Sequence, residues 1–434
     1  MPEIGGMSVN PAVIMIMFFF VLVITGLPIA FSFGVSSLIF LCRDSNFTIL
    51  ISRTFGGVDS FALLAVPFFI YAGDLMKEGG ISRSLISVAD KLIGSLKGGI
   101  GHVCIVTSCF FGAISGSSAA TVAAIGGIMI PEMEKRGYEK RYAVAIASAA
   151  GFLGIMMPPS VPLIIYGLNA QISVLSLFLG SLVPGILVTV AFMAVNYNQV
   201  EKYSQQAKID ETVGEYQGNQ KSVIPAVLMP VWILGGIYSG ICTPTEAGAV
   251  AVFYGFFVSA FYYRTLKLKQ FLEITTGSAT TSAIILVIIA FASVFGWIMT
   301  TEQLPSLLRD SVTSITNNKY VILLMLNIFY LIIGAFMETI TAIVITTPLF
   351  LPLVTSVGVD PVHFGIIQQL NLCVGLITPP MALNLLIGSK IGNIKIEKVI
   401  KPLMPYLVTS IIMVLIVTYI PALSTWLPDL LTGK

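Results

Sequence analysis

The chain carries few charged residues. Only 10% of its 434 residues are Asp, Glu, Lys or Arg, whereas 56% are hydrophobic and the mean hydropathy is +0.94. Soluble domains carry about 25% charged residues, and this chain instead repeats apolar stretches long enough to cross a bilayer as helices. The formal net charge of +2 is too small to indicate nucleic acid or another acidic partner. The composition predicts an all-α polytopic membrane protein.

Residues that carry most enzymatic chemistry are also scarce. The chain has two histidines and five cysteines, with no C-x-x-C spacing, so we expect packed thiols rather than a zinc site or a disulfide framework. The sequence lacks the G-x-x-x-x-G-K-[ST], H-E-x-x-H and G-x-S-x-G motifs, which argues against a nucleotide cofactor and against common hydrolases. We therefore expect a protein that is not an enzyme.

One pattern of glycine and proline occurs twice. The proline and the second glycine follow the first glycine by 19 and 42 residues in one copy, and by 18 and 41 in the other. Such residues break helices, and an opened backbone is tolerated at membrane depth only where it lines a cavity. Paired interruptions of this kind point to the binding site of a transporter. The two copies are Gly112-Ala113, Pro131 and Gly154-x-x-x-Pro158-Pro159, and Gly334-Ala335, Pro352 and Gly375-x-x-x-Pro379-Pro380.

Two apolar runs are too long for one helix. The 34 residues from Gly98 to Pro131 would extend about 51 Å as a helix, well beyond a hydrocarbon core of roughly 30 Å. The small, polar residues from Gly112 to Ser118 suit a tight turn, so we predict a re-entrant hairpin. The run from Tyr320 to Val357 predicts a second hairpin, whose tip from Gly334 to Thr339 contains Glu338 as its only charge.

A span broken at Pro-Pro follows each hairpin, from Tyr142 to Asn169 and from Val362 to Ser389. Proline has no N–H and clashes with the preceding turn, so carbonyls near Gly154 to Met157 and Gly375 to Thr378 lose their helical partners. We expect the tips and breaks to meet near the midplane, with oxygens suited to Na⁺ and half-helix N-termini suited to an anion. The side chains involved are Ser115, Ser117, Ser118, Thr121, Ser160, Thr339, Thr341, Thr378 and Asn384.

Basic residues predict opposite orientations for the two units. Only Arg309 and Lys319 flank the base of the second hairpin, whereas four lysines follow its broken span, beginning with Lys390. By the positive-inside rule the first hairpin opens to the cytoplasm and the second to the opposite side, which predicts an inverted repeat. The eight basic residues around the first unit are Lys77, Arg83, Lys91, Lys97, Lys135, Arg136, Lys140 and Arg141.

Several segments outside the hairpins have their own signals. The amphipathic stretches from Ser82 to Lys97 and from Arg264 to Thr276 predict interfacial helices rather than extra spans, and Glu201 to Lys221 predicts a cytoplasmic linker. The stretch from Pro11 to Cys42 carries Gly26-Leu27-Pro28 at its middle, which is compatible with one kinked helix or with two helices.

Six titratable residues lie in or beside apolar sequence. Glu246 and Glu338 are candidates for a functional carboxylate, with a structural ion pair or an interface position as equal alternatives. Asp59 and Asp74 are expected at span ends and His102 and His363 at entrances, in solvated positions in preference to proton relays.

The expected domain organisation follows these signals. Residues 1–97 supply scaffold helices and an interfacial arm, 98–173 and 318–391 form the two transport-domain repeats, 174–317 supply scaffold helices, the linker and a second arm, and 392–434 form the C-terminal transmembrane helix.

Over nearly its whole length the chain resembles the DctM-like large membrane subunit (M subunit) of TRAP transporters, the tripartite ATP-independent periplasmic carriers. The motifs that carry this resemblance are Gly26-Leu-Pro-Ile-Ala30, Val66-Pro-Phe-Phe-Ile70, Gly112-Ala-Ile-Ser-Gly-Ser117, Met157-Pro-Pro-Ser160, Thr243-Pro-Thr-Glu-Ala-Gly248 and Thr378-Pro-Pro-Met-Ala-Leu-Asn384. The resemblance implies an elevator-type, Na⁺-coupled importer of an organic acid in the bacterial inner membrane. It also implies a periplasmic substrate-binding protein and a small four-helix Q subunit, here expected as a separate chain. A stand-alone Na⁺/divalent-anion symporter is the alternative.

Site residues follow from the same resemblance. One sodium site would use oxygens around Gly112, Ser115, Gly154, Met157 and Pro159, and a second would use those around Gly334, Gly375, Thr378 and Met381. Substrate contacts would fall on Ser117, Ser118, Thr121, Ser160 and Asn384. The first tip reads Ser115-Gly-Ser-Ser-Ala-Ala-Thr121, which resembles members that handle sialic acid more than the Ser-Gly-Ser-Ala-Val-Ala-Asp tip of many dicarboxylate-type members. Sialic acid is thus the favoured substrate, and a C4-dicarboxylate is next.

Overall fold

The computed structural model describes residues 3–4, 7–8, 10–42, 47–204 and 224–432. Within them, seven helices are long and apolar enough to cross a membrane, and a bent helix pair forms a further candidate span. The strands are one antiparallel pair, β1 (Glu3–Ile4) and β2 (Met7–Ser8). The predicted all-helical, polytopic fold is confirmed. Most of the predicted linker, residues 205–221, lies outside the described residues.

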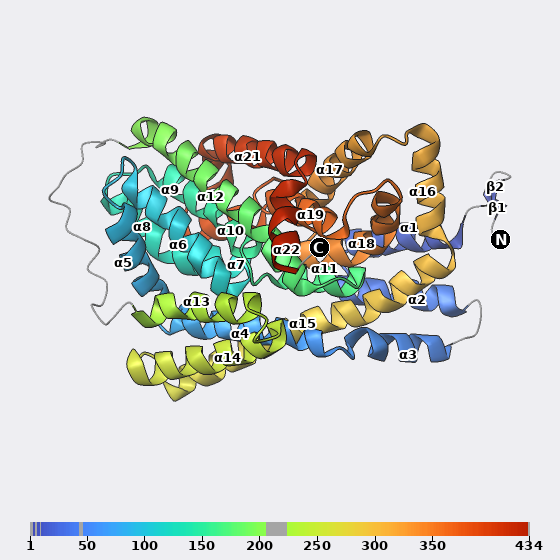
Figure 1. Cartoon of the computed structure of the whole chain (residues 1–434), viewed down its shortest axis with the longest axis horizontal. Coiled ribbons are helices and arrows are strands. Elements are labelled where there is room, and N and C mark those ends of the chain that lie inside the picture. Colours follow the sequence, from blue (N-terminus) through green and yellow to red (C-terminus); the bar gives the residue numbers. More distant parts are fainter. Residues whose placement is uncertain (1–2, 5–6, 9, 43–46, 205–223, 433–434) are drawn as a thin grey trace.

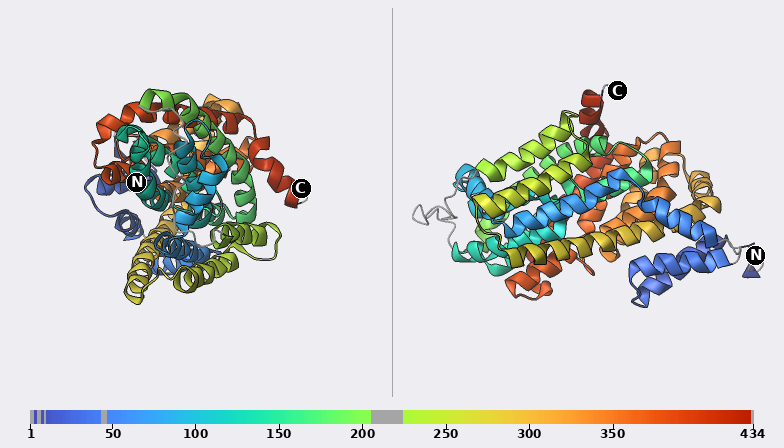
Figure 2. Two further views of the ribbon diagram at one scale, coloured as in Figure 1. Left: turned by 90° about the vertical axis from the view of Figure 1, so that its left-hand side faces the viewer. Right: turned by 90° about the horizontal axis from the view of Figure 1, so that it is seen from below.

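One group of helices packs around a long central helix, α15, and is called the α15 block. Rings of Phe19, Phe33 and Phe295 join α1, α2 and α15, and α14 lies along α4 (Figures 1 and 2). The block comprises α1 (Pro11–Ile24), α2 (Ile29–Cys42), α3 (Phe47–Val58), η1 (Phe61–Leu64), α4 (Ala65–Glu78), α13 (Ile224–Tyr238), α14 (Pro244–Phe257), the π-helical η3 (Val258–Tyr262) and α15 (Leu268–Thr301).

The sequence left open whether the stretch from Pro11 to Cys42 is one kinked helix or two helices. Residues 25–28 separate α1 from α2, with Gly26 at φ +90°, a conformation that glycine adopts without steric cost. The stretch from Pro11 to Cys42 is therefore two helices.

The second group, called the repeat block, contains both predicted units. The first unit comprises α6 (Gly99–Ser115), α7 (Ser118–Thr121), the π-helical η2 (Val122–Gly126), α8 (Gly127–Lys135), α9 (Lys140–Gly151), α10 (Leu153–Met156) and α11 (Val161–Ala170). The second comprises α17 (Lys319–Phe336), α18 (Thr339–Ser356), α19 (Pro361–Gly375) and α20 (Leu383–Gly392). Helix α5 (Ile81–Ile93) precedes the first unit and α16 (Leu304–Ile315) precedes the second, and neither is counted in the block. Three further helices complete the block: α12 (Val174–Tyr203), α21 (Ile396–Tyr419) and α22 (Ala422–Thr432).

Both predicted hairpins form, and each turns at its predicted tip. Helix α6 ends at Ser115, Gly116 adopts φ +56°, and the Ser117 side chain accepts a bond from the Ala120 N–H at 3.3 Å to start the returning helix. Helix α17 ends at Phe336, and the Glu338 carboxylate accepts from the Thr341 N–H at 3.2 Å to start α18. Capping satisfies backbone donors that a helix start would otherwise leave unpaired.

The two units enter the molecule from opposite ends. Helix α5, which precedes the first hairpin, lies at the left end of Figure 1, whereas α16, which precedes the second, crosses the right end. Both helices run across the direction of the long spans rather than along it (Figure 1). This is the arrangement expected for an inverted repeat with one interfacial helix at each membrane surface.

The prediction of an interfacial helix from Arg264 to Thr276 is wrong. Residues 268–276 are not a separate helix but the first turns of α15, which continues to Thr301. Two polar side chains near this end of α15 bond to α4: Thr275 Oγ1 lies 2.7 Å from the Tyr71 hydroxyl, and Ser278 donates to Asp74 at 2.6 Å. The interfacial counterpart of α5 is α16, which is also amphipathic.

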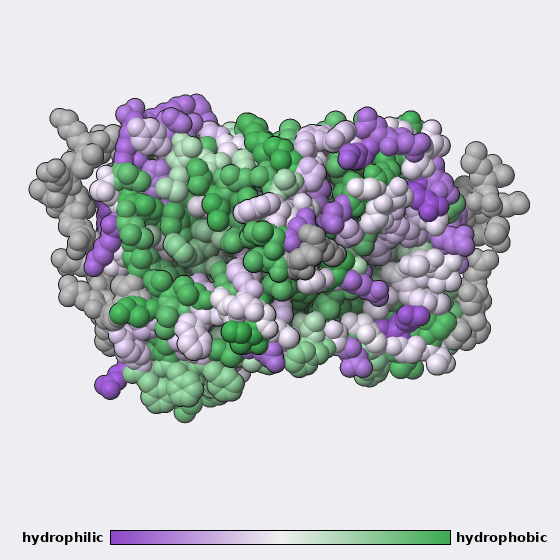
Figure 3. Space-filling model, viewed as in Figure 1, coloured by the Kyte–Doolittle hydropathy of each residue, from purple (hydrophilic) through white to green (hydrophobic). Residues whose placement is uncertain are grey.

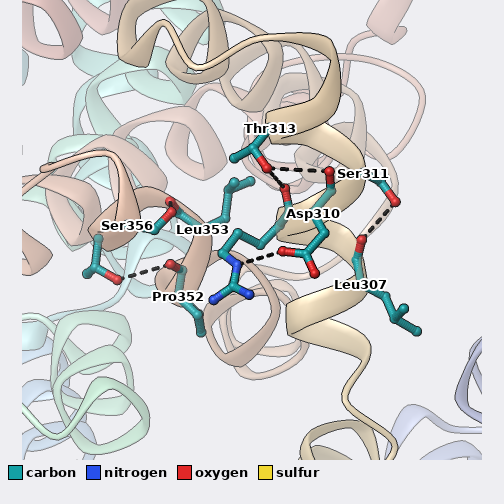
Figure 4. A network of polar contacts seen from close by, with 9 residues as sticks. Leu307, Asp310, Ser311, Thr313, Pro352, Leu353 and Ser356 are labelled. Carbon is teal, nitrogen blue, oxygen red and sulfur yellow. Dashed lines mark hydrogen bonds and ion pairs between the residues drawn. The ribbon is translucent and has the colours of Figure 1, made fainter.

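Figure 4 shows how α16 lies against the end of α18. Ser311 donates to the Leu307 carbonyl at 2.7 Å, Thr313 donates to the Arg309 carbonyl at 2.8 Å, and Ser356 donates to the Leu353 carbonyl at 2.6 Å. Each hydroxyl thus bonds within its own helix.

Helices α12 and α21, which the sequence analysis placed outside the two repeats, pack against them. Helix α12 contacts α6, α11 and α19, and α21 contacts α9 and α19. The buried Asn196 of α12 donates to the Gly98 carbonyl at 2.9 Å and accepts from the Tyr142 hydroxyl at 3.1 Å. This amide ties the base of the first hairpin to both α9 and α12.

The two histidines differ from their predicted positions, because neither is solvated. His102 is 3% exposed and His363 is 2% exposed. Nε2 of His102 lies 2.9 Å from the Lys97 carbonyl, and Nδ1 of His363 lies 2.6 Å from the Ser424 hydroxyl. Each ring ties together neighbouring segments, which sequence position alone does not reveal. All five cysteines are free thiols, of which Cys104 and Cys373 are buried and Cys42 is exposed.

Hydrophobic side chains cover much of the surface. Figure 3 shows them over the middle of one face, with hydrophilic side chains gathered toward the two ends. Large exposed side chains include Phe55, Trp232 and Phe253. Such a surface suits lipid rather than water.

Replacing Asn196 should test the tie at the hairpin base. We expect Asn196→Ala to destabilise the protein by about 1–3 kcal/mol, because buried groups of Gly98 and Tyr142 lose their partner. Thermal unfolding in detergent measures this. The control is Asn198→Ala, since Asn198 is exposed and bonds only to the Ala194 carbonyl of its own helix. Equal loss in both variants would contradict the assignment.

Candidate functional site

Each hairpin tip contacts the break of the following span through a glycine pair. A Cβ placed on Gly112 would lie 2.7 Å from the Gly154 Cα, and one placed on Gly375 would lie 2.2 Å from the Gly334 carbonyl carbon. Real Cβ atoms do not approach other atoms this closely, so only glycine allows these contacts. The glycines that repeat in the sequence are thus the points where tip and break meet in both units.

The two breaks leave backbone groups without helical partners. Both Pro158-Pro159 and Pro379-Pro380 are cis. The Gly154 carbonyl has no hydrogen-bond donor among the described residues, because the residue four positions on is Pro158. This oxygen is available to a ligand, as the sequence predicts.

Other carbonyls at the breaks accept hydrogen bonds from donors outside the regular helical pattern. The Gln369 side chain donates to the Ile155 carbonyl at 3.0 Å, the Thr378 N–H donates to Gly375 at 3.1 Å, and the Asn384 N–H donates to Leu376 at 3.0 Å. The breaks therefore expose fewer free oxygens than proline chemistry alone suggests.

The residues of the first expected sodium site are gathered at one tip and one break. Gly116 approaches the Pro159 carbonyl, which would lie 2.7 Å from an added Cβ. The Ser115 hydroxyl lies 3.4 Å from that of Thr121, and Gly154 lies against both Thr121 and the Ser117 carbonyl. The Met157 side chain points toward Gly185 of α12, so only its backbone faces the break.

The residues of the second expected site are likewise brought together. Gly334 and Gly375 are in contact, the Met381 N–H donates to the Ala335 carbonyl at 3.2 Å, and the Thr378 hydroxyl donates to the Val374 carbonyl at 2.7 Å. The non-helical segment between α19 and α20 thus lies on the second tip.

The five expected substrate contacts fall into two groups. Ser117 and Ser118 line a cavity of about 610 Å³, whereas Thr121, Ser160 and Asn384 do not line it and are fully buried behind it. The Ser160 hydroxyl has no hydrogen-bond partner among the described residues. The structure therefore places Ser117 and Ser118 at the cavity and the other three within the protein.

Asn384 has a structural position that its sequence motif does not reveal. Its Oδ1 lies 2.8 Å from the Ser118 hydroxyl, and its Nδ2 donates to the Ser148 carbonyl at 3.2 Å. The Ser118 hydroxyl also lies 2.8 Å from the Gly151 carbonyl. One buried amide thus joins α20 of the second unit to the tip and the broken span of the first.

The cavity lies between the two blocks. Its walls come from α4 and α15 on one side, and from both hairpin tips, α10, α11 and α20 on the other. Gly73 of α4 approaches the first tip so closely that an added Cβ would lie 2.9 Å from the Ser115 Cα. A molecule held at the tips would therefore also face the α15 block.

Four charged residues line the cavity: Asp74, Lys77, Glu338 and Lys390. Only Glu338 was considered for a functional role in the sequence analysis, and it both caps α18 and faces the cavity. Helical spacing is the signal for the others, because Ile70, Gly73, Asp74 and Lys77 share one face of α4, and Leu383, Ile387, Lys390 and Ile391 share one face of α20.

Glu246 has a different and purely local position. The Glu246 N–H donates to the Thr243 hydroxyl at 3.3 Å, and the Glu246 carboxylate accepts from the Thr243 N–H at 2.8 Å. This is a capping box at the start of α14. Glu246 is exposed and does not line the cavity, so its role in the structure is to start a helix.

A family model described as "Tripartite ATP-independent periplasmic transporter, DctM component" matches residues 16–423. The chain belongs to this family. It is therefore a membrane subunit of a tripartite transporter rather than an enzyme, and a multi-pass protein of the inner membrane.

Curated relatives agree on the family and differ in substrate. The chain is 42% identical to an isethionate TRAP transporter permease protein DctMQ of Oleidesulfovibrio alaskensis, over 96% of this chain and 66% of that protein. It is 35% identical to the sialic acid TRAP transporter large permease protein SiaM of Vibrio cholerae, over 95% and 97% of the two chains. It is 37% identical to the C4-dicarboxylate TRAP transporter large permease protein DctM of Pseudomonas aeruginosa, over 91% and 92%.

A solved structure supports the fold alone. The YdaH transporter of Alcanivorax borkumensis aligns with a TM-score of 0.65 at 17% identity, over 97% of this chain and all of that one. The DctM-family chain thus shares an overall helical arrangement with a transporter of low sequence similarity.

Substitution of Gly375 tests the contact between tip and break. We expect Gly375→Ala to destabilise the protein strongly, by about 2–4 kcal/mol, because the added methyl would strike the backbone of Gly334 rather than a flexible side chain. The measurement is thermal unfolding of the purified protein. Gly296→Ala in α15 is the matched control, since nothing lies within 4 Å of an added Cβ there. A Gly375→Ala protein as stable as this control would show that the glycines are not in close contact.

Proposed function

We propose that this chain carries an organic anion inward across the membrane, coupled to Na⁺, as the large subunit of a TRAP transporter. The observation that carries the proposal is the convergence of two hairpin tips and two proline breaks on one cavity between the α15 block and the repeat block. Family membership supports the wider setting, in which a periplasmic binding protein delivers the substrate and a small membrane subunit completes the transporter.

Sodium is proposed as the coupling ion because of the donor atoms. Neutral carbonyl and hydroxyl oxygens suit a hard monovalent cation. The free Gly154 carbonyl and the Ser115 and Thr121 hydroxyls lie together at the first tip. At the second tip, the Thr378 hydroxyl and the backbone around Gly334, Gly375 and Met381 form the proposed counterpart.

The substrate is proposed to be an organic acid held at the tips. Ser117 and Ser118 line the cavity, which is large enough for a small organic acid. Relatives named for isethionate, sialic acid and C4-dicarboxylates all present an acidic group, so the shared feature is the anion. Sialic acid remains the first candidate on the tip sequence and a C4-dicarboxylate the second.

Movement of the repeat block against the α15 block is the proposed transport step. Helices α12 and α21 pack on the repeat units, so we extend the moving unit beyond residues 98–173 and 318–391 to include them. Helices α5 and α16, one at each end, would act as the arms that hold this unit (Figure 1).

Uptake into proteoliposomes tests the proposed function as a whole. Vesicles would contain the chain with its small membrane subunit, and radiolabelled isethionate, sialic acid and succinate would be offered with the binding protein. We expect uptake of at least one acid only with an inward Na⁺ gradient and only with the binding protein present. Undiminished uptake when K⁺ replaces Na⁺ would contradict the coupling. Uptake without binding protein would favour the stand-alone symporter.

Removing one proposed ligand should weaken Na⁺ activation selectively. We expect Ser115→Ala to raise the Na⁺ concentration for half-maximal uptake by about tenfold, because a charged partner loses one donor atom. The same assay on Ser108→Ala, which removes a buried hydroxyl from the same helix, should give the wild-type value. An unchanged Na⁺ dependence in Ser115→Ala would remove this residue from the site.

A further inference from the structure

Two lysines face the cavity from opposite blocks. Lys77 lies on α4 of the α15 block, and Lys390 lies on α20 of the repeat block. Neither was selected by the sequence analysis as a site residue. Asp74 and Glu338 also line the cavity, so the formal net charge of its lining is zero. The position of each charge therefore decides which ligands the cavity attracts.

Lys77 is accompanied by acidic groups. Its Nζ lies 3.4 Å from the Glu78 carboxylate, and Asp74 precedes it by one helical turn on the same cavity face. Much of its charge is therefore balanced locally in this state.

Lys390 is different. The ion pairs among the described residues do not include it, and the residues beside it on the cavity face of α20 are the apolar Leu383, Ile387 and Ile391. Lys390 is exposed on this cavity face, so its ammonium group can attract an entering anion without first leaving an acidic partner.

The neighbouring face of α20 is fixed to the first unit. Asn384 bonds to Ser148 and Ser118 as described, and Gly388 packs so closely that an added Cβ would lie 2.3 Å from the Ser148 hydroxyl. The face that carries Lys390 is thus held in a set orientation beside Ser117 and Ser118. Lys390 would travel with the repeat block, whereas Lys77 would stay with the α15 block.

We propose that Lys390 is a specificity-determining residue that binds the acidic group of the substrate while the repeat block moves, and that Lys77 adds attraction only while α4 and α20 face the same cavity. This inference rests on the proposed function. A lysine ammonium is a compact charge without the fixed fork of arginine, so the site accepts a carboxylate or a sulfonate. That tolerance fits a family whose relatives are named for both classes of acid.

Charge-selective thiol labelling tests the electrostatic part without a known substrate. Ala123 lines the cavity on η2, which packs on α20, and Ala123→Cys would be made in a protein whose more accessible thiols, Cys42, Cys109 and Cys242, are replaced by alanine. The rate of modification by anionic 2-sulfonatoethyl methanethiosulfonate is divided by the rate for its cationic trimethylammonium analogue. We expect Lys390→Gln to lower this ratio by about fivefold or more, and Lys390→Arg to retain it.

Controls separate this role from a general loss of charge or fold. Lys398→Gln removes an exposed lysine that does not line the cavity and should leave the ratio unchanged, whereas Lys77→Gln should lower it in this state. In the uptake assay, Lys390→Gln should reduce transport of the accepted acid at least about tenfold, Lys390→Arg should restore most of it, and the thermal unfolding temperature should stay at the wild-type value.

The two proposals fail in distinguishable ways. Absence of Na⁺-driven uptake by the wild-type transporter would contradict the proposed function. The labelling ratio would still report on Lys390 in that case. An unchanged ratio in Lys390→Gln, or an altered ratio with undiminished uptake, would overturn the role of Lys390 alone.

Discussion

Backbone groups at membrane depth must find partners inside the protein, and the arrangement of this chain depends on that constraint. A hairpin tip and a broken span each leave N–H and C=O groups without helical partners. In both units the tip lies directly on the break, at the pairs Gly112–Gly154 and Gly334–Gly375. Side-chain donors such as Gln369 then satisfy part of what proline removes, and the oxygens that stay open lie beside the cavity.

The inverted repeat brings two copies of the contact between tip and break to one cavity. Because the units enter from opposite ends, their tips meet in the interior, and each brings its own break. Neither unit alone encloses the cavity, since α4 and α15 supply the facing wall. A site built at the boundary of two packed blocks can be opened to either side by relative motion without dismantling the hairpins.

Local chemistry explains what could be predicted from sequence. Run length against bilayer thickness predicted the hairpins, and glycine and proline spacing predicted the tips and breaks, because both signals act within a few residues. Tertiary packing explains which features could not be predicted from the sequence. Most of the stretch from Arg264 to Thr276 is the start of α15, whose Thr275 bonds to Tyr71 of α4, and Asn384 faces Ser148 rather than the cavity. When two side chains in contact are more than two hundred positions apart, one sequence alone does not reveal the contact. The spacing of Lys390 with Leu383 and Ile387 could, however, have predicted that these residues share one face of α20.

The amide of Asn384 also limits how the repeat block can deform. It connects the start of the returning half of the first hairpin with α20 of the second unit, in a place where water is excluded. Pulling these parts away from each other would strand several polar atoms in a dry interior, at about 1–3 kcal/mol apiece. The two units are therefore held together by buried polar contacts as well as by apolar packing.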